Sequence, residues 1–252
     1  MNQGMNELIK QFINYKDFII EYLITSIFLI LIIIIVTKNF KNHRKTMFFI
    51  GFPILLFINL CEDLIRKELT VLDNAVYTYI SGFISNNLTI LMNVVSYIGS
   101  AQILIIITLL SYLIFKKDKN YKQYWKIIAL NLSVTWILNA VFKSIFQRQR
   151  PELLRLSQAS GYSFPSGHSM VSISFYGLII YLCYINIKNY WTKYILAILL
   201  SLLIIFIGIS RIYLGVHYAS DVIAGFASGF AWLIVYITLV YKYKFLEYKG
   251  QV

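Results

Sequence analysis

The sequence is poor in charge, proline, cysteine and histidine. Only 13% of its 252 residues are charged, and it has three prolines, two cysteines and three histidines, whereas 59% of the residues are hydrophobic. So little charge beside such long apolar runs excludes an ordinary soluble domain and indicates a polytopic membrane protein. No Pro-rich or Ser-rich linker divides the chain, so one helical domain is the simplest interpretation.

The two cysteines do not indicate a disulfide or a metal site. Cys61 is expected near the outer end of the second apolar run and Cys183 near the inner end of the fifth. The two thiols would then lie on opposite faces of the membrane, too far apart to pair. Neither resembles a catalytic or metal-binding cysteine.

The apolar runs predict an all-α integral membrane fold with about seven spans, because each is close to the length of a bilayer-crossing helix. They cover residues 18–37, 47–64, 90–115, 124–146, 167–187, 192–212 and 216–240. The first contains Glu21 and lacks a small-residue cleavage site, which favours a retained anchor over a signal peptide. Residues 65–89 are too polar to span and predict an amphipathic helix on the outer interface.

The basic residues predict the orientation. If the spans alternate, fourteen of the 23 lysines and arginines lie on one side, in the odd-numbered connections and the tail. By the positive-inside rule this side is cytoplasmic and includes the C-terminus, so the N-terminus lies outside the plasma membrane. Because the net charge of +12 follows the loops, it favours acidic lipids of the bilayer as partners and argues against nucleic acid.

One segment places Arg211, His217 and Asp221 between two apolar runs, where charge is costly to hold. His217 and Asp221 are four residues apart, so on a helix they would share one face and could hydrogen-bond. A histidine oriented by a carboxylate can act as a nucleophile or base. The segment is therefore a candidate site.

Three polar clusters fall at the predicted outer ends of four spans, although hydropathy alone set the spans. The clusters are Lys143, Arg150 and Pro151; Pro165, Ser166, Gly167 and His168; and Ser210, Arg211, His217 and Asp221. Three cations suit an oxyanion with dispersed charge, and a serine and glycine at a helix start can cap the helix and cradle a phosphate. Two imidazoles can serve a displacement and the protonation of its leaving group.

These clusters resemble the three motifs of the type 2 phosphatidic acid phosphatase (PAP2) superfamily, which includes vanadium haloperoxidases and bacterial lipid phosphatases. KSIFQRQRP at 143–151 matches Lys, six residues, Arg-Pro, and PSGH follows at 165–168. Residues 210–221 match Ser-Arg, five residues, His, three residues, Asp. The resemblance implies a PAP2-like helical bundle over 47–240, with a six-helix core. Residues 1–46 would add an anchor and a basic loop, and 241–252 a basic tail.

The resemblance also implies the role of each site residue and a reaction without metal or cofactor. His217 is expected to attack phosphorus and form a phosphohistidine, Asp221 to orient it, and His168 to protonate the leaving oxygen and then activate water. The phosphoryl oxygens are expected to contact Lys143, Arg150, Ser166, Gly167 and Arg211.

Other interpretations of the same residues stay open. His217 and Asp221 could form a buried structural pair, or bind a metal with His168, although three nearby cations disfavour a divalent ion. Arg148 and Arg155 have no motif position and are expected on a solvated outer loop, with head-group contact as the second interpretation.

The sequence therefore predicts an integral membrane phosphatase that hydrolyses a lipid phosphomonoester or pyrophosphate at the outer face. Undecaprenyl pyrophosphate is the first candidate substrate, followed by phosphatidylglycerophosphate and phosphatidic acid. A transporter or scramblase that binds lipid head groups through the same cations is the alternative from another class, and a lipid phosphotransferase is a variant of the first.

Overall fold

The computed structural model describes residues 43–118, 121–152 and 155–243. Over these residues the secondary structure consists of eight helices and no strand, as the sequence predicts. The helices are α2 (His43–Arg66), α3 (Leu69–Ser81), α4 (Asn86–Ile98), α5 (Ala101–Phe115), α6 (Tyr124–Phe146), α7 (Gly167–Asn186), α8 (Tyr190–Tyr213) and α9 (Ala219–Lys242). The predicted first span, 18–37, lies outside the described residues.

Four of the described helices, α6 to α9, are long and apolar enough to cross a membrane. The pair α4 and α5 would make a fifth crossing if it acts as one span. Helix α2, 24 residues long, occupies the position of the predicted second span. The structure thus supports several crossings, but it does not confirm the predicted count of seven.

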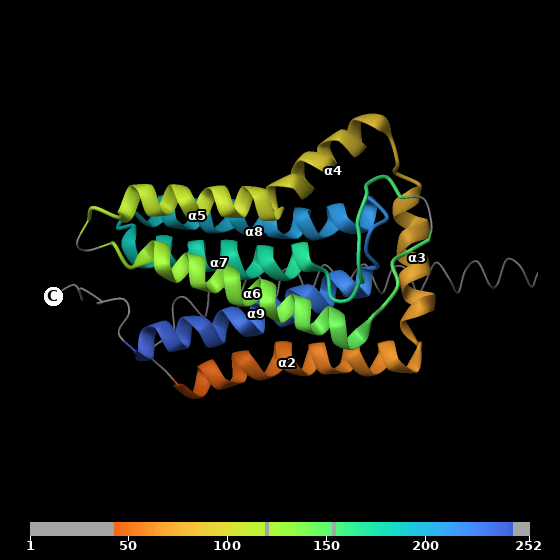
Figure 1. The fold of residues 1–252 in the computed structure, drawn as a ribbon, viewed down its shortest axis with the longest axis horizontal. Coiled ribbons are helices and arrows are strands. Elements are labelled where there is room, and N and C mark those ends of the chain that lie inside the picture. Colours follow the sequence, from red (N-terminus) through yellow and green to blue (C-terminus); the bar gives the residue numbers. More distant parts are fainter. Residues whose placement is uncertain (1–42, 119–120, 153–154, 244–252) are drawn as a thin grey trace, which may run out of the picture.

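The predicted third span, 90–115, is not one straight helix. It is formed by α4 and α5, which meet at an angle of 45° around Gly99 and Ser100. At this point the chain passes very close to α8, because a Cβ added at Gly99 would lie 2.7 Å from the Ile207 side chain. The bend tilts α4 away from the bundle (Figure 1).

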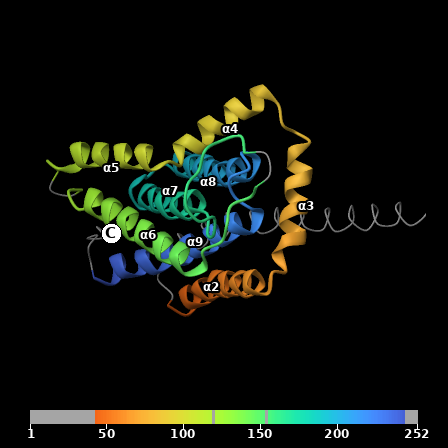
Figure 2. The ribbon, with the colours of Figure 1, turned by 45° about the vertical axis from the view of Figure 1, so that its right-hand side comes forward.

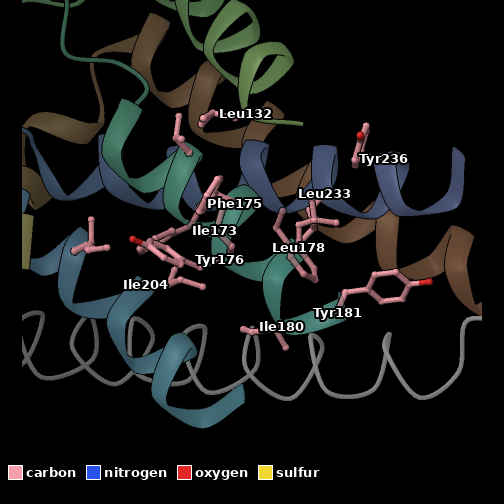
Figure 3. Close-up of a cluster of buried hydrophobic side chains, with 14 of the residues drawn as sticks. Leu132, Ile173, Phe175, Tyr176, Leu178, Ile180, Tyr181, Ile204, Leu233 and Tyr236 are labelled. Atoms are coloured by element: carbon pink, nitrogen blue, oxygen red, sulfur yellow. The ribbon is translucent and has the colours of Figure 1, made fainter. Parts of the chain in front are cut away.

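Helices α7 and α9 form the centre of the bundle, and almost every residue of α7 from Ser169 to Leu182 is buried. Figure 3 shows Phe175 and Leu178 of α7 among Ile204 of α8 and Leu233 of α9. Small residues allow the backbones to approach, since a Cβ at Gly225 of α9 would lie only 2.6 Å from the Ser166 carbonyl oxygen.

The outward faces of α5 and α8 are apolar. Both helices expose large aliphatic side chains, including Leu109 and Ile114 of α5 and Ile198 and Leu199 of α8. Exposed apolar side chains of this kind suit contact with lipid chains, where the helix satisfies its own backbone hydrogen bonds.

Helix α3 lies across one end of the bundle, where α6 and α8 end and α7 and α9 begin (Figures 1 and 2). Its position fits the interfacial helix predicted within 65–89, although the same stretch also contains the start of α4. One side of α3 is buried, at Leu69, Asp73 and Val76, while Val71 is 79% exposed. The three polar clusters converge beneath this helix.

Candidate active site

His217 and Asp221 lie at the junction of α8 and α9. The sequence predicted that they share one face of a helix, but only Asp221 is helical. His217 belongs to the short link after α8, and its backbone N–H donates to the Arg211 carbonyl, 3.2 Å away. Asp221 is in the first turn of α9, where its Oδ2 accepts the Tyr218 backbone N–H at 2.9 Å. This capping contact turns the carboxylate back toward the link, and Oδ2 lies 3.4 Å from His217 Nδ1.

The geometry around His217 suits attack by Nε2. When Nδ1–H faces the Asp221 carboxylate, the lone pair is on Nε2, the other ring nitrogen. This Nε2 lies 3.3 Å from Nη1 of Arg150, so a cation is adjacent to the potential nucleophile. The Nδ1 to Oδ2 distance is long, as is common before substrate tightens such contacts.

The environment of His217 favours its neutral form. Burial lowers the pKa of the imidazole well below its usual 6.5, and the charges of Arg150, Arg211 and Lys143 lower the pKa further. A neutral imidazole is the form that can attack an electrophile, so the site keeps this histidine reactive at neutral pH.

The cations Lys143, Arg150 and Arg211 converge on this histidine from three elements. Lys143, at the end of α6, donates to the carbonyls of Tyr162 and Ser163. Arg150, in the loop after α6, donates to the carbonyl oxygens of Ser160, Gly161 and Val216 at 2.7 to 2.9 Å. These acceptors are neutral, so they orient the two side chains without cancelling their charge.

Arg211, at the end of α8, is buried and donates to the Ser96 hydroxyl of α4. Its Nε is buried and has no hydrogen-bond partner within the described structure. Burial of a guanidinium with an unsatisfied donor is costly unless another acceptor binds there. An anion between the three cations would supply that acceptor.

The PSGH segment forms the start of α7. Ser166 is the N-cap, and its hydroxyl accepts the Ser169 backbone N–H at 3.5 Å, as the sequence predicts. Its own backbone N–H donates to the Asp221 carbonyl at 2.9 Å, which joins α7 to α9. The close approach at Gly167 is to the Asn139 amide oxygen, 2.9 Å from an added Cβ. Asn139 also donates to the Pro165 carbonyl and was not predicted as a site residue.

His168 lies in the first turn of α7, within electrostatic range of both His217 and the cations. The structure therefore brings all eight predicted site residues to one end of the bundle. Over the described part of the chain, no group of three or more His, Cys, Asp or Glu side chains is placed to hold a metal ion.

The prediction that Arg148 lies on a solvated outer loop was wrong. Its side chain is only 11% exposed and forms ion pairs with Asp73 and Asp221, both at 2.6 Å. Asp73 is also buried and is the only acidic residue of α3. A lone acid in an otherwise uncharged helix was the available signal for Asp73, whereas Arg148 looked like any polar loop residue.

The fold resembles that of membrane proteins of known structure. The structure is similar to that of a transmembrane PAP2-type phosphatidylglycerolphosphate phosphatase from Bacillus subtilis, with a TM-score of 0.73, 24% identity, and coverage of 77% of this chain and 97% of that one. It also matches LpxE of Aquifex aeolicus, with a TM-score of 0.52 and 23% identity over 64% of this chain and 92% of that one. The fold is thus that of the PAP2-type membrane proteins.

Sequence comparison agrees over part of the chain. Residues 123–245 match the PAP2 superfamily model, and this matched segment includes all three motifs. Phosphatidylglycerophosphatase B of Bacillus subtilis (strain 168) is 36% identical over 115 residues. That alignment covers 43% of this chain and 55% of the relative, so the chain spans about half of that protein's length. Together, the apolar helices and these relatives indicate a multi-pass membrane protein.

Proposed function

We propose that the protein is a lipid phosphate phosphatase that works through a phosphohistidine at His217. The observation that carries the proposal is the group of three cations, Lys143, Arg150 and Arg211, around the buried imidazole of His217. In the described structure these cations form no ion pair with a carboxylate, unlike Arg148. Their charge is available to a phosphoryl group, whose negative charge is spread over several oxygens.

The proposed reaction has two steps. In the first, Nε2 of His217 attacks phosphorus, the bond from phosphorus to the lipid oxygen breaks, and that oxygen takes a proton from His168. In the second, water attacks the phosphohistidine and gives a proton to His168, the phosphorus–nitrogen bond breaks, and inorganic phosphate leaves. Asp221 stabilises the tautomer of His217 with the proton on Nδ1 throughout.

The three cations and the start of α7 have the supporting role in both steps. Lys143, Arg150 and Arg211 would bind the phosphoryl oxygens as charge develops on them, with Ser166 and the Gly167 amide contributing from the helix N-terminus. No metal ion or cofactor is needed for this scheme.

The position of the site supports a lipid substrate. The cations lie at the end of a bundle whose outer faces are apolar, so a head group could reach them while its chains stay in the bilayer. We propose that this end faces the extracytoplasmic side, from the distribution of basic residues along the chain. The name of the Bacillus subtilis relative puts phosphatidylglycerophosphate first for testing, with undecaprenyl pyrophosphate and phosphatidic acid beside it.

The test is phosphate release by the purified full-length protein in detergent with a metal chelator. Each of the three lipids is assayed separately, with His217→Ala as the blank and His43→Ala, a histidine outside the three motifs, as the matched control. Loss of the nucleophile is expected to lower kcat by on the order of 10⁴-fold or more, while His43→Ala stays active.

Labelling tests the covalent step. A lipid labelled in its phosphate should transfer the label to the wild-type protein, in a form that is stable to base and labile to acid, as expected of a phosphorylated imidazole. His217→Ala should take up no label. Full phosphate release by His217→Ala, or no release from any of the lipids by the wild type, would refute the proposed function.

A further inference from the structure

Arg148 has contacts of a different kind from those of the other site cations. Its Nη1 donates to Asp221 Oδ1 at 2.6 Å and to the Ser220 hydroxyl at 2.8 Å, and its Nη2 donates to Asp73 Oδ2 at 2.6 Å. Its guanidinium lies over the ring of Tyr218, 4.1 Å from the centroid. The terminal nitrogens are therefore directed at two carboxylates, and one face of the group is covered by an aromatic ring.

Asp73 anchors this arrangement from α3. Its Oδ1 accepts the Ser220 backbone N–H at 2.9 Å, and its Oδ2 accepts the Ser220 hydroxyl at 2.7 Å in addition to Arg148. Ser220 lies in the first turn of α9, so a carboxylate from another helix caps the N-terminus of α9. Asp73 thus fixes both Arg148 and the first turn that carries Asp221.

The two oxygens of Asp221 have separate partners. Oδ1 accepts from Arg148, whereas Oδ2 accepts the Tyr218 N–H and faces Nδ1 of His217. Because both oxygens are constrained, the carboxylate cannot rotate away from the imidazole. Arg148 also supplies the positive charge that a buried carboxylate needs in order to stay ionised.

We propose that Arg148, anchored by Asp73, is a positioning residue for the Asp221–His217 pair and does not bind the phosphoryl group. The inference rests on the proposed function, because it assigns Arg148 an effect on the step that His217 would carry out. It extends that function to two residues that hold no fixed position in the three motifs, and one of them, Asp73, lies in the helix that crosses the end of the bundle.

The experiment separates the chemical step from phosphate binding. Hydrolysis of dioctanoyl phosphatidic acid in detergent gives kcat and KM, and inhibition by inorganic phosphate reports binding of the phosphoryl group. Arg148→Gln is compared with Arg150→Gln, which removes a proposed phosphate ligand. Arg66→Gln is the matched control, because it breaks an ion pair with Glu62 whose side chains are 61% and 53% exposed.

We expect Arg148→Gln to lower kcat by about 10- to 100-fold, as is typical when an outer partner of a reacting group is lost. Its inhibition constant for phosphate should stay within about twofold of the wild type, whereas Arg150→Gln should raise that constant. Arg148→Lys keeps the charge and can reach one carboxylate, so its kcat should fall between the wild type and Arg148→Gln. If Arg148→Gln does not fold, the kcat and the inhibition constant of Arg148→Lys test the inference instead.

A double mutant tests the anchor. Asp73→Asn alone should lower kcat less than Arg148→Gln does, and adding it to Arg148→Gln should have little further effect, because the two residues act through one network. Unchanged kcat in Arg148→Gln, or an inhibition constant that rises as in Arg150→Gln, would overturn the inference. Independent, additive losses would show that Asp73 does not act through Arg148 and would overturn its role as anchor.

The outcomes distinguish this inference from the proposed function. The proposed function is supported if the wild type and Arg66→Gln release phosphate and His217→Ala does not. This holds whatever the activity of Arg148→Gln. If those proteins are active and Arg148→Gln is fully active too, only the positioning role fails. If the wild type releases no phosphate from any lipid, the proposed function fails and the inference fails with it.

Discussion

Removal of the Asp73 side chain should destabilise the protein far more than removal of an exposed acid. The carboxylate of Asp73 is fully buried and accepts three hydrogen bonds, two from Ser220 and one from Arg148. Asp73→Ala would leave the Ser220 N–H without an acceptor and would take one of two carboxylates from Arg148. Both groups are too deeply placed for water to replace the loss fully.

The magnitude follows from the type of contact. Removal of one partner of a buried ion pair costs about 3 to 5 kcal/mol. Because Arg148 keeps its ion pair with Asp221, the lower end of that range, about 3 kcal/mol, is expected for Asp73→Ala. At roughly 2 to 4 °C per kcal/mol for a domain of this size, Tm should fall by about 6 to 12 °C.

The control is Glu62→Ala, which removes an acid from an exposed ion pair with Arg66. Such pairs contribute about 0 to 1 kcal/mol, so Tm should change by at most about 4 °C. Unfolding can be followed in detergent with a dye that reacts with thiols, because Cys61 and Cys183 are both free and half-buried. All variants should be heated at one rate, since membrane proteins often unfold irreversibly. A decrease in Asp73→Ala no larger than that in Glu62→Ala would refute the reasoning.

Three further predictions concern the site and the helix packing. Burial and nearby cations lower the pKa of His217 below 6.5, and the neutral imidazole is the proposed nucleophile. As pH falls, kcat/KM should therefore decline only below pH 6.5. A decline centred above pH 6.5 would contradict this assignment. Ser96→Ala removes the acceptor of Arg211 and should raise KM by about tenfold in the lipid assay, whereas an unchanged KM would show that Ser96 does not hold this cation. Gly225→Ala would place a Cβ 2.6 Å from a backbone oxygen and should lower Tm by several degrees, for a cost of about 1 to 3 kcal/mol. The control is Gly51→Ala, because a Cβ added at Gly51 meets no atom within 4 Å, and this variant should keep or raise Tm. Equal changes of Tm in the two variants would count against close packing of α7 and α9.

The sequence was most informative where a local pattern decides the structure. Apolar runs predicted the positions of α6 to α9 to within a few residues, because each helix has to satisfy its own backbone in an apolar environment. The Ser166 cap was predictable for a similar reason, since the residue type and its place before an apolar run indicate a helix start. The three motifs lie at the ends of those helices, so their convergence followed from the topology.

The remaining features depend on contacts between distant segments. Arg148 is buried because Asp73, 75 residues earlier, meets it from a helix that crosses the bundle. Nothing adjacent to Arg148 distinguishes it from Arg155, which is exposed. Likewise, the bend at Gly99 depends on the close approach of α8, and the hydropathy of 90–115 gave no sign of a break.

The capping of α9 by Asp73 has a consequence for biosynthesis. The contact joins residues 147 positions apart, and α9 follows every other described helix in the chain. Contacts of such long range form late, after the intervening segments have been made and packed. His217 and its partners therefore come together only when the last of these helices enters the membrane. Until then, a nascent chain would carry the cations of α6 and α8 without a nucleophile held beside them.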